Sequence, residues 1–384
     1  MNTAADKIRA EIAGRGAISF ARFMELALYC PDCGFYEREN DTIGRGGDFY
    51  TSVSVGPLFG ELLAFQFAEW LAESGTWNAE RGSSPVEIVE AGAHDGRLAK
   101  DILNWLRLHR PALFEQIEYR IVEPSARRQE RQRETLGQFA PRVRWVADLG
   151  SLRRGSNGTV SPPPSARRPP PSVCGIIFGN ELLDALPVQR MGWDARRREW
   201  FEWGVIAEKE WFVWVRLPNA NPVSRFPFPV PPEVLAVLPD GFSTEICPAA
   251  ESWWRAAAGR LERGRLLTFD YGLNAEEFFS PQRAGGTLRA YHRHRFSADV
   301  LGNVGEQDLT AHVNFSAIQA AGEAAGLRTE RLETQARFLT EIARRAWDQG
   351  SGFGHWTPTH TRQFQTLTHP EHLGRPFRVL VQAK

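Results

Sequence analysis

Hydrophobic positions along the chain recur with two periods, and each period predicts a different kind of element. Near the N-terminus, apolar side chains four residues apart, such as Ile8 and Ile12, predict two helices over residues 6–30. A further helix is predicted over residues 57–73, with Pro57 in the first turn, where proline is favoured. The chain therefore begins with a helical region.

The middle of the chain alternates short apolar strands with amphipathic helices. Strands are predicted at Val86–Glu90, Glu118–Val122, Val143–Val146, Ile176–Phe178, Arg265–Phe269 and Phe377–Val381. Helices are predicted at Leu98–Leu108, Ala126–Gln138, Ala249–Leu261, Phe315–Ala325 and Ala336–Trp347, and the second of these is so charged that it should face solvent. Alternation of strand and helix is typical of a mostly parallel α/β sheet with right-handed crossovers, as in Rossmann-like folds.

Two segments interrupt this alternation. Residues 155–172 contain six prolines and almost no apolar side chain, which predicts a disordered surface loop or a proline-rich recognition motif. Residues 187–232 hold five tryptophans within 22 positions, and their period of two predicts an inserted antiparallel subdomain. These aromatic side chains would pack across neighbouring strands or bind a partner.

Four consecutive regions are predicted on this basis, and residues 273–310 are expected to be mostly loop. The regions are an N-terminal helical region with a covering loop (1–80), a Rossmann-like core (81–186), a Trp-rich insert with a helix (187–262), and the completion of the core sheet (263–384).

Composition narrows the class of protein. Lys plus Arg and Asp plus Glu each number 46 in 384 residues, and this neutral balance argues weakly against nucleic acid as a partner. No apolar run approaches the ~18 residues of a membrane span, and the N-terminus lacks a secretory signal, so a cytoplasmic protein is expected. Cys30 and Cys33 form an isolated CxxC without the further ligands of a zinc site, so no metal is predicted.

A glycine turn is predicted where the first core strand meets its helix, in EIVEAGAHDGRLAKDIL. Glu90 ends the strand, and Gly92 and Gly96 allow a left-handed turn and close approach of the backbone to a ligand. The turn departs from the G-x-G-x-x-G pattern of dinucleotide sites. The alternative is that the glycines only allow tight packing of helix on strand.

Acidic residues make the prediction more specific. Glu123 and Asp148 follow the second and third core strands, so three successive strands end in an acid. A carboxylate at these positions can accept hydrogen bonds from ribose hydroxyls and from an adenine amino group. The pattern favours an adenosine ligand without phosphate, and S-adenosylmethionine fits it better than NAD.

Further polar side chains follow the fourth core strand, in IIFGNELLDALPVQ. Glu181 and Asp184 are three residues apart, so they would share one face if they lay on a helical turn. Together with Asn180 they could bind a cationic substrate. The alternative is a helix cap or a solvated turn.

At this point the chain resembles the MidA-like (DUF185) methyltransferases, from about Ile18 to Val381. The matching stretches are RFMELALYCPDCGFY, GGDFYTSVSVGPLFGELLA, VEAGAHDGRLAKDIL, NELLDALPV, LLTFDYG, GTLRAYHRH, DLTAHVNFSA, TQARFL and GRPFRVL. The resemblance implies a class I fold that uses S-adenosylmethionine. It also implies protein arginine N-methylation, with a respiratory complex I subunit homologue as substrate. His94 and Ser54 depart from the family pattern, which usually has a glycine and an acid there.

We therefore expect a methyltransferase in which Glu181 and Asp184 orient a guanidinium and receive its proton, Asn180 shapes the site, and the family motif contributes His312. The cofactor would be held by Glu90, Gly92, Gly96, Glu123 and Asp148, under a lid that carries Asp48, Thr51 and Ser52. A small-molecule methyltransferase and a non-catalytic assembly factor are alternatives, and a dehydrogenase is a more distant one. The composition is compatible with a homodimer.

Overall fold

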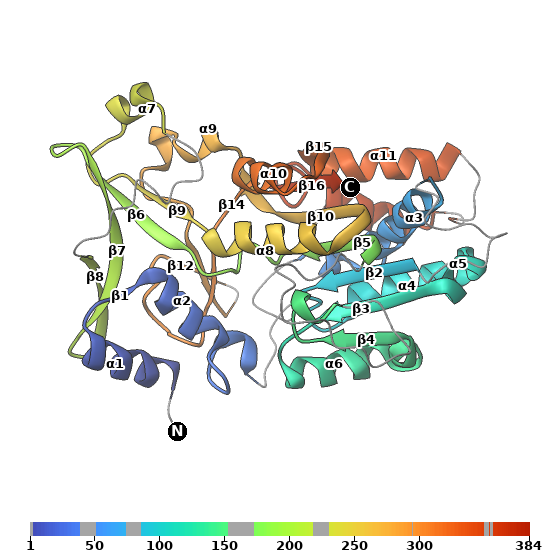
Figure 1. Cartoon of the computed structure of the whole chain (residues 1–384), viewed down its shortest axis with the longest axis horizontal. Helices are drawn as coiled ribbons and strands as arrows, with labels where there is room; N and C mark the ends of the chain where they lie inside the picture. Colours follow the sequence, from blue (N-terminus) through green and yellow to red (C-terminus); the bar gives the residue numbers. More distant parts are fainter. Residues whose placement is uncertain are drawn as a thin grey trace, which may run out of the picture. The chain divides into compact units, whose positions relative to one another are not determined.

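The computed structural model describes residues 3–38, 51–73, 86–152, 173–217, 230–293, 295–348, 353 and 356–384 (Figure 1). Asp48 and the proline-rich segment 155–172 lie outside these residues. The chain forms two compact units, each built from three separated segments. Unit 1 comprises Met1–Tyr50, Leu183–Ser252 and Tyr271–Ala320, and unit 2 comprises Thr51–Leu182, Trp253–Asp270 and Ala321–Lys384. No helix in the described ranges is long and apolar enough to cross a membrane.

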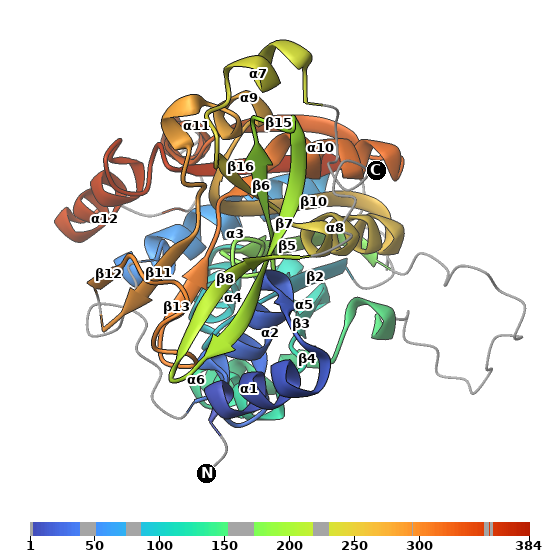
Figure 2. The ribbon, with the colours of Figure 1, turned by 90° about the vertical axis from the view of Figure 1, so that its left-hand side faces the viewer.

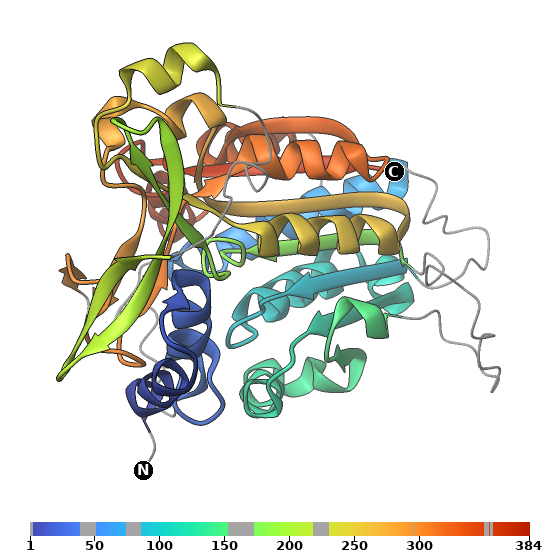
Figure 3. The same cartoon turned by 60° about the vertical axis from the view of Figure 1, so that its left-hand side comes forward.

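Unit 2 is organised around the predicted, mostly parallel sheet (Figure 3). The strand order is β15-β16-β10-β5-β2-β3-β4, with β15 (Arg328–Thr334), β16 (Phe377–Ala383), β10 (Leu261–Leu273), β5 (Val173–Asn180), β2 (Val86–Ala91), β3 (Ile117–Val122) and β4 (Val143–Val146). The neighbours from β10 to β4 pair in parallel, and β15 pairs with β16 antiparallel. The carboxyl ends of β5, β2, β3 and β4 therefore share one edge of the sheet.

Helices cover this sheet. They are α3 (Leu58–Glu73), α4 (Arg97–His109), α5 (Pro111–Gln116), α6 (Ala126–Leu136), α11 (Gln335–Asp348) and α12 (Pro358–Thr368), and α8 (Pro248–Arg260) leads into β10. α3 is apolar on nearly all sides, as expected of a core helix, and Phe59 and Phe67 contact Phe269 and Phe178 of the sheet. The prediction that α6 faces solvent is wrong in part. One side of the helix is covered, because Gln132 and Leu136 are buried.

Unit 1 contains the predicted antiparallel insert (Figure 2). Its five strands are β6 (Gln189–Asp194), β7 (Glu199–Glu208), β8 (Trp211–Arg216), β9 (Ser243–Ile246) and β1 (Ile18–Ser19). Trp193 and Trp200 lie opposite each other on β6 and β7, with ring centroids 5.1 Å apart. Trp203 and Trp214 likewise meet edge to face across β7 and β8. These contacts support cross-strand packing, although Trp211 is 71% exposed.

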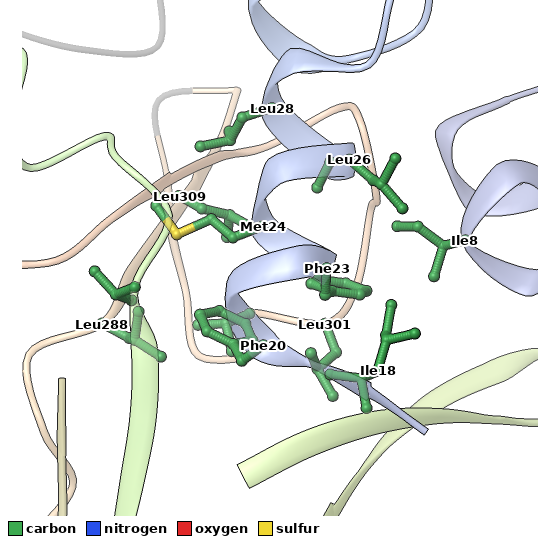
Figure 4. Packing of buried hydrophobic residues seen from close by; sticks show 14 of the residues in the cluster. Ile8, Ile18, Phe20, Phe23, Met24, Leu26, Leu28, Leu288, Leu301 and Leu309 are labelled. Atoms are coloured by element: carbon green, nitrogen blue, oxygen red, sulfur yellow. The ribbon is translucent and has the colours of Figure 1, made fainter. Parts of the chain in front are cut away.

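The N-terminal helices α1 (Ala4–Arg15) and α2 (Phe20–Tyr29) form as predicted and belong to unit 1. Figure 4 shows Phe20, Phe23 and Met24 of α2 in a cluster that also includes Leu288 and Leu309. Helix and strand segments that are far apart in the sequence therefore share one apolar core.

The prediction of loop over residues 273–310 is wrong in part. A three-stranded antiparallel sheet forms from β11 (Arg289–His292), β12 (Arg295–Ser297) and β13 (Asp308–Thr310), and α9 (Ala275–Phe278) precedes it. Strands of three or four residues are too short to show a period of two. Near the same region, β14 (Val313–Asn314) pairs with the end of β10 and leads into α10 (Phe315–Ala324).

Candidate active site

The glycine turn between β2 and α4 has three residues in the left-handed region. The φ angles are 72° at Gly92, 47° at His94 and 85° at Gly96. A Cβ at Gly92 would lie 2.9 Å from Leu182 Cδ1, and a Cβ at Gly96 would lie 3.3 Å from Gln132 Cα. Both glycines are thus required by conformation and by packing. A glycine would also be favoured at position 94, because a residue with a Cβ costs about 1–2 kcal/mol there.

Gln132 of α6 connects this turn to the neighbouring strand ends, and the sequence analysis did not identify it. Its side chain is fully buried. Nε2 donates to the His94 carbonyl at 2.9 Å and to Glu123 Oε2 at 3.3 Å, while Oε1 accepts from Trp145 Nε1 at 2.8 Å. The sequence signal for the burial of Gln132 was its position four residues before Leu136 in an otherwise charged helix, since residues four apart share a helix face.

Glu123 lies directly after β3 at the shared strand edge, as predicted. The residue is 1% exposed. Oε1 accepts from the Ser125 backbone N–H at 2.9 Å and lies 3.1 Å from Arg128 Nε. The guanidinium and the hydrogen-bond donors therefore compensate the negative charge of this buried carboxylate.

The other two strand-end acids lie in different surroundings. Glu90 is buried in β2, and its Oε2 accepts from the Tyr119 hydroxyl at 2.6 Å. Burial raises the pKa of Glu90 to about 7, which the Tyr119 hydrogen bond opposes. Asp148 is exposed after β4, where its Oδ1 accepts from the Ser151 backbone N–H and hydroxyl.

Asn180 and Glu181 lie at the carboxyl end of β5. The pKa of Glu181 is shifted further than that of Glu90 at the same edge. Glu181 has a φ of 52°, and its Oε1 accepts from Asn180 Nδ2 at 3.0 Å and from the Ser52 backbone N–H at 3.2 Å. Burial raises the pKa of Glu181 to about 8. The hydrogen bonds from Asn180 and Ser52 oppose this rise, and the nearby Asp270 charge adds to it. Asn180 Oδ1 is buried and makes no hydrogen bond.

Thr51 and Ser52, which were predicted to belong to a lid, lie next to Glu181 in unit 2. The Ser52 hydroxyl donates to Gln335 Oε1 at 3.1 Å, and Gln335 Nε2 donates to the Leu367 carbonyl. Thr51 and Ser54 exchange hydrogen bonds with one another. Ser52 is therefore fixed from two sides, and a lid movement of this segment stays a prediction.

The expected helical turn through Glu181 and Asp184 does not form. The left-handed conformation at Glu181 ends the regular geometry of β5 and directs the chain into non-helical turns, so the two carboxylates do not share a helical face. Asp184 is buried in unit 1, where its carbonyl accepts from the Ala311 N–H at 3.0 Å.

His312 also belongs to unit 1. Its ring is parallel to that of Tyr271, with centroids 6.5 Å apart, and Nδ1 is buried without a hydrogen-bond partner. Burial, together with the charges of Arg289 and Arg283, lowers the pKa of His312 to about 4. The imidazole is therefore neutral at physiological pH and can accept a hydrogen bond.

The strand edge of unit 2 fits S-adenosylmethionine, whose ribose hydroxyls and adenine amino group are hydrogen-bond donors. Glu123 offers a buried carboxylate, Asp148 accepts both hydrogen bonds from Ser151 through Oδ1, and Asn180 Oδ1 is a buried acceptor with no partner. The left-handed glycines leave the turn without side chains at its tightest points. Among the described residues, no group of three or more His, Cys, Asp or Glu is placed to hold a metal ion.

Known proteins resemble this chain in sequence and in fold. Residues 62–332 match the family described as "Putative S-adenosyl-L-methionine-dependent methyltransferase" (Methyltransf_28). The crystal structure of a COG1565 superfamily protein from Burkholderia thailandensis, bound to S-adenosyl-homocysteine, has a TM-score of 0.79 and 33% identity. The similarity covers 99% of this chain and 92% of that chain.

Curated relatives include protein arginine methyltransferases of mitochondria. The NDUFAF7 homolog of Drosophila melanogaster is 27% identical over 404 residues, which cover 98% of this chain and 84% of the relative. NDUFAF7 of Mus musculus is 30% identical over 332 residues, which cover 83% of this chain and 69% of the relative.

The fold and the strand edge define a class I methyltransferase that uses S-adenosylmethionine. The family match extends over most of the chain, so the protein belongs to the Methyltransf_28 family. This confirms the resemblance, the fold and the cofactor predicted from the sequence. The individual residue roles stay predictions.

Proposed function

We propose that this protein methylates a guanidinium nitrogen of arginine in a protein substrate. The similarity to the NDUFAF7 arginine methyltransferases over most of the chain supports the substrate class. The observation that carries the chemistry is the carboxyl of Glu181, which follows β5, accepts hydrogen bonds from Ser52 and Asn180, and has its pKa raised to about 8. A carboxyl with that pKa can accept a proton near neutral pH.

The residues of unit 2 take separate roles in this proposal. Glu123 and Asp148 accept hydrogen bonds from the nucleoside, and Asn180 Oδ1 accepts from a donor near the reacting centre. S-adenosylmethionine, when bound, supplies a methyl group already activated for attack by nitrogen.

Methylation of an arginine releases one proton, because the guanidinium stays cationic after the methyl group is added. An approaching cation lowers the pKa of Glu181 and favours the carboxylate, which can orient the substrate N–H groups. As the nitrogen–carbon bond forms, the same carboxylate takes the released proton. The hydrogen bonds from Ser52 and Asn180 hold Glu181 Oε1 in place for this step.

The test uses S-adenosylmethionine with a radiolabelled methyl group. The purified protein is incubated with an extract of its source cells from which the corresponding gene has been deleted. We expect label in the protein fraction, released as methylarginine on acid hydrolysis, and no label with Glu181→Gln. Label confined to small molecules would contradict the proposal, and so would cofactor binding without any transfer.

A complex I subunit homologue as substrate, a cytoplasmic location and a homodimer belong to the same proposal. Mass spectrometry of the labelled protein identifies the substrate directly. Sedimentation of the purified protein measures the oligomeric state.

A further inference from the structure

Unit 1 contains a pocket of its own, and the roles proposed above do not use it. Its empty volume is about 420 Å³, which includes the opening to solvent. The walls come from β9, the turn after β5 and the segment that runs from β14 into α10. Glu245, Glu251, His312 and Asn314 are its main polar lining residues. No Lys or Arg belongs to the lining among the described residues.

Two buried acceptor atoms in this pocket make no hydrogen bond. Glu245 is 4% exposed, and its Oε1 makes no hydrogen bond. His312 is half-buried, and its buried Nδ1 makes no hydrogen bond either. A buried polar atom without a partner costs about 1–3 kcal/mol, so such atoms are rare unless something binds them.

Thr287 holds the Glu245 carboxylate and contacts the backbone of His312. Its N–H and hydroxyl donate to Glu245 Oε2 at 2.6 Å and 2.9 Å, and the hydroxyl accepts from the His312 backbone N–H at 3.2 Å. Because Oε2 is held in this way, Oε1 is the oxygen left for a ligand. The pocket thus presents preorganised acceptors and is built to receive a group with several N–H donors.

The charges around the pocket favour a cation as the ligand. Burial raises the pKa of Glu245, and the charge of Arg190, the hydrogen bonds from Thr287 and the charge of Arg289 oppose this rise. Neither guanidinium lines the pocket, because Arg190 lies over the ring of Trp214 and Arg289 over that of Phe296. The lining itself therefore has only acidic and neutral polar groups.

We infer that this pocket binds a guanidinium group, with Glu245 Oε1 and His312 Nδ1 as its hydrogen-bond acceptors. A planar guanidinium carries five N–H donors and pairs with carboxylates better than an ammonium does. The inference rests on the proposed function only for identifying this group as an arginine side chain. It adds Glu245, which no sequence motif indicated, as a substrate-binding residue in unit 1, distinct from Glu181 of unit 2.

The test measures binding without methyl transfer. The probe is the peptide acetyl-Gly-Arg-Gly-amide, and its citrulline counterpart is the neutral control of the same shape. Both are titrated into the full chain saturated with S-adenosylhomocysteine, while the imidazole resonances of labelled histidine are followed by NMR. His312→Phe retains a ring beside Tyr271 and identifies the resonance of His312.

We expect the arginine peptide to shift the His312 resonance saturably and the citrulline peptide to shift it little. Glu245→Gln can still accept both bonds from Thr287, but it places an N–H₂ donor where Oε1 lies. This variant should weaken arginine binding at least tenfold while its melting temperature stays close to that of the wild type. Glu233→Gln, an exposed change on α7 (Pro232–Val237), is the matched control and should change nothing.

Equal shifts from both peptides, or full affinity in Glu245→Gln, would overturn the inference. Calorimetry with S-adenosylhomocysteine on the same samples separates this result from a failure of the proposed function. If S-adenosylhomocysteine binds and the arginine peptide does not, only the inference about the pocket fails. If the peptide binds specifically but no condition gives methyl transfer, the pocket stands and the proposed function fails.

Discussion

The turns after β3 and β5 both carry a glutamate, but their surroundings give the two carboxyls opposite character. Glu123 lies 3.1 Å from the Arg128 guanidinium and accepts a backbone N–H. Glu181 has no guanidinium among its pKa-determining neighbours, and the Asp270 charge raises its pKa further. Two acids at equivalent strand ends can therefore differ in their chemical function. Glu123 is suited to bind donors as an anion, whereas Glu181 is suited to exchange a proton.

The largest effect should come from removing the proton acceptor. Glu181→Gln keeps the size of the side chain but cannot take up a proton, so we expect the methyl-transfer rate to fall by about 10²–10⁴-fold. The affinity for S-adenosylhomocysteine should stay within a few-fold of the wild type. Single-turnover kinetics and calorimetry measure the two quantities separately.

The pH dependence provides an independent check on Glu181. Its pKa in the folded protein is raised to about 8, so folding favours the protonated form. The resulting stabilisation is complete below the unfolded pKa and is lost as the pH rises toward 8. The melting temperature of the wild type should therefore fall relative to that of Glu181→Gln between pH 5 and pH 9. Parallel curves would mean that Glu181 is ionised throughout.

The next largest effect should come from neutralising Glu123. Glu123→Gln removes a charged acceptor and leaves Arg128 without its partner carboxylate, so S-adenosylhomocysteine should bind about 10–100-fold more weakly. Isothermal titration calorimetry measures this loss. Glu130→Gln is the control, because the Glu130 side chain lies on α6, as Arg128 does, and is 68% exposed. Unchanged affinity in Glu123→Gln would show that the turn after β3 does not hold the nucleoside.

Replacing Gln132 tests whether the surroundings of Glu123 depend on this buried side chain. Gln132→Ala removes the hydrogen bonds to the His94 carbonyl and from Trp145 Nε1, so we expect a loss of about 1–3 kcal/mol in the free energy of unfolding. Urea denaturation measures the loss, with the exposed Gln138→Ala as control. Equal stability of both variants would mean that water replaces the Gln132 side chain.

The smallest effect concerns the glycine turn that lies between these strand ends. Gly92→Ala should cost about 1–2 kcal/mol for the left-handed conformation, plus a term for the 2.9 Å approach to Leu182 Cδ1. Gly241 has a φ of 77°, close to that of Gly92, and a Cβ there would meet no atom within 4 Å, so Gly241→Ala reports the conformational term alone. Thermal unfolding of both variants isolates the contribution of Leu182. Identical losses would show that the Leu182 side chain moves aside.

Local patterns in the sequence determined much of this protein. Apolar periodicity predicted the helices and strands of the core, because each side of a helix or strand repeats at a fixed interval. The acids after β2, β3 and β4 could be predicted to share one edge, since parallel strands end on the same side of a sheet. The Trp-rich segment was also predicted as antiparallel strands. By contrast, the short strands β11 to β13 lacked a readable period.

The tertiary structure alone decided what each acidic side chain can do. The pKa of Glu181 depends on the hydrogen bond from Ser52, 129 residues earlier, and on the charge of Asp270. Glu245 meets His312 only because two separated segments form unit 1. Burial and the charge of neighbours set a pKa, and both arise from contacts between residues that are distant in the chain.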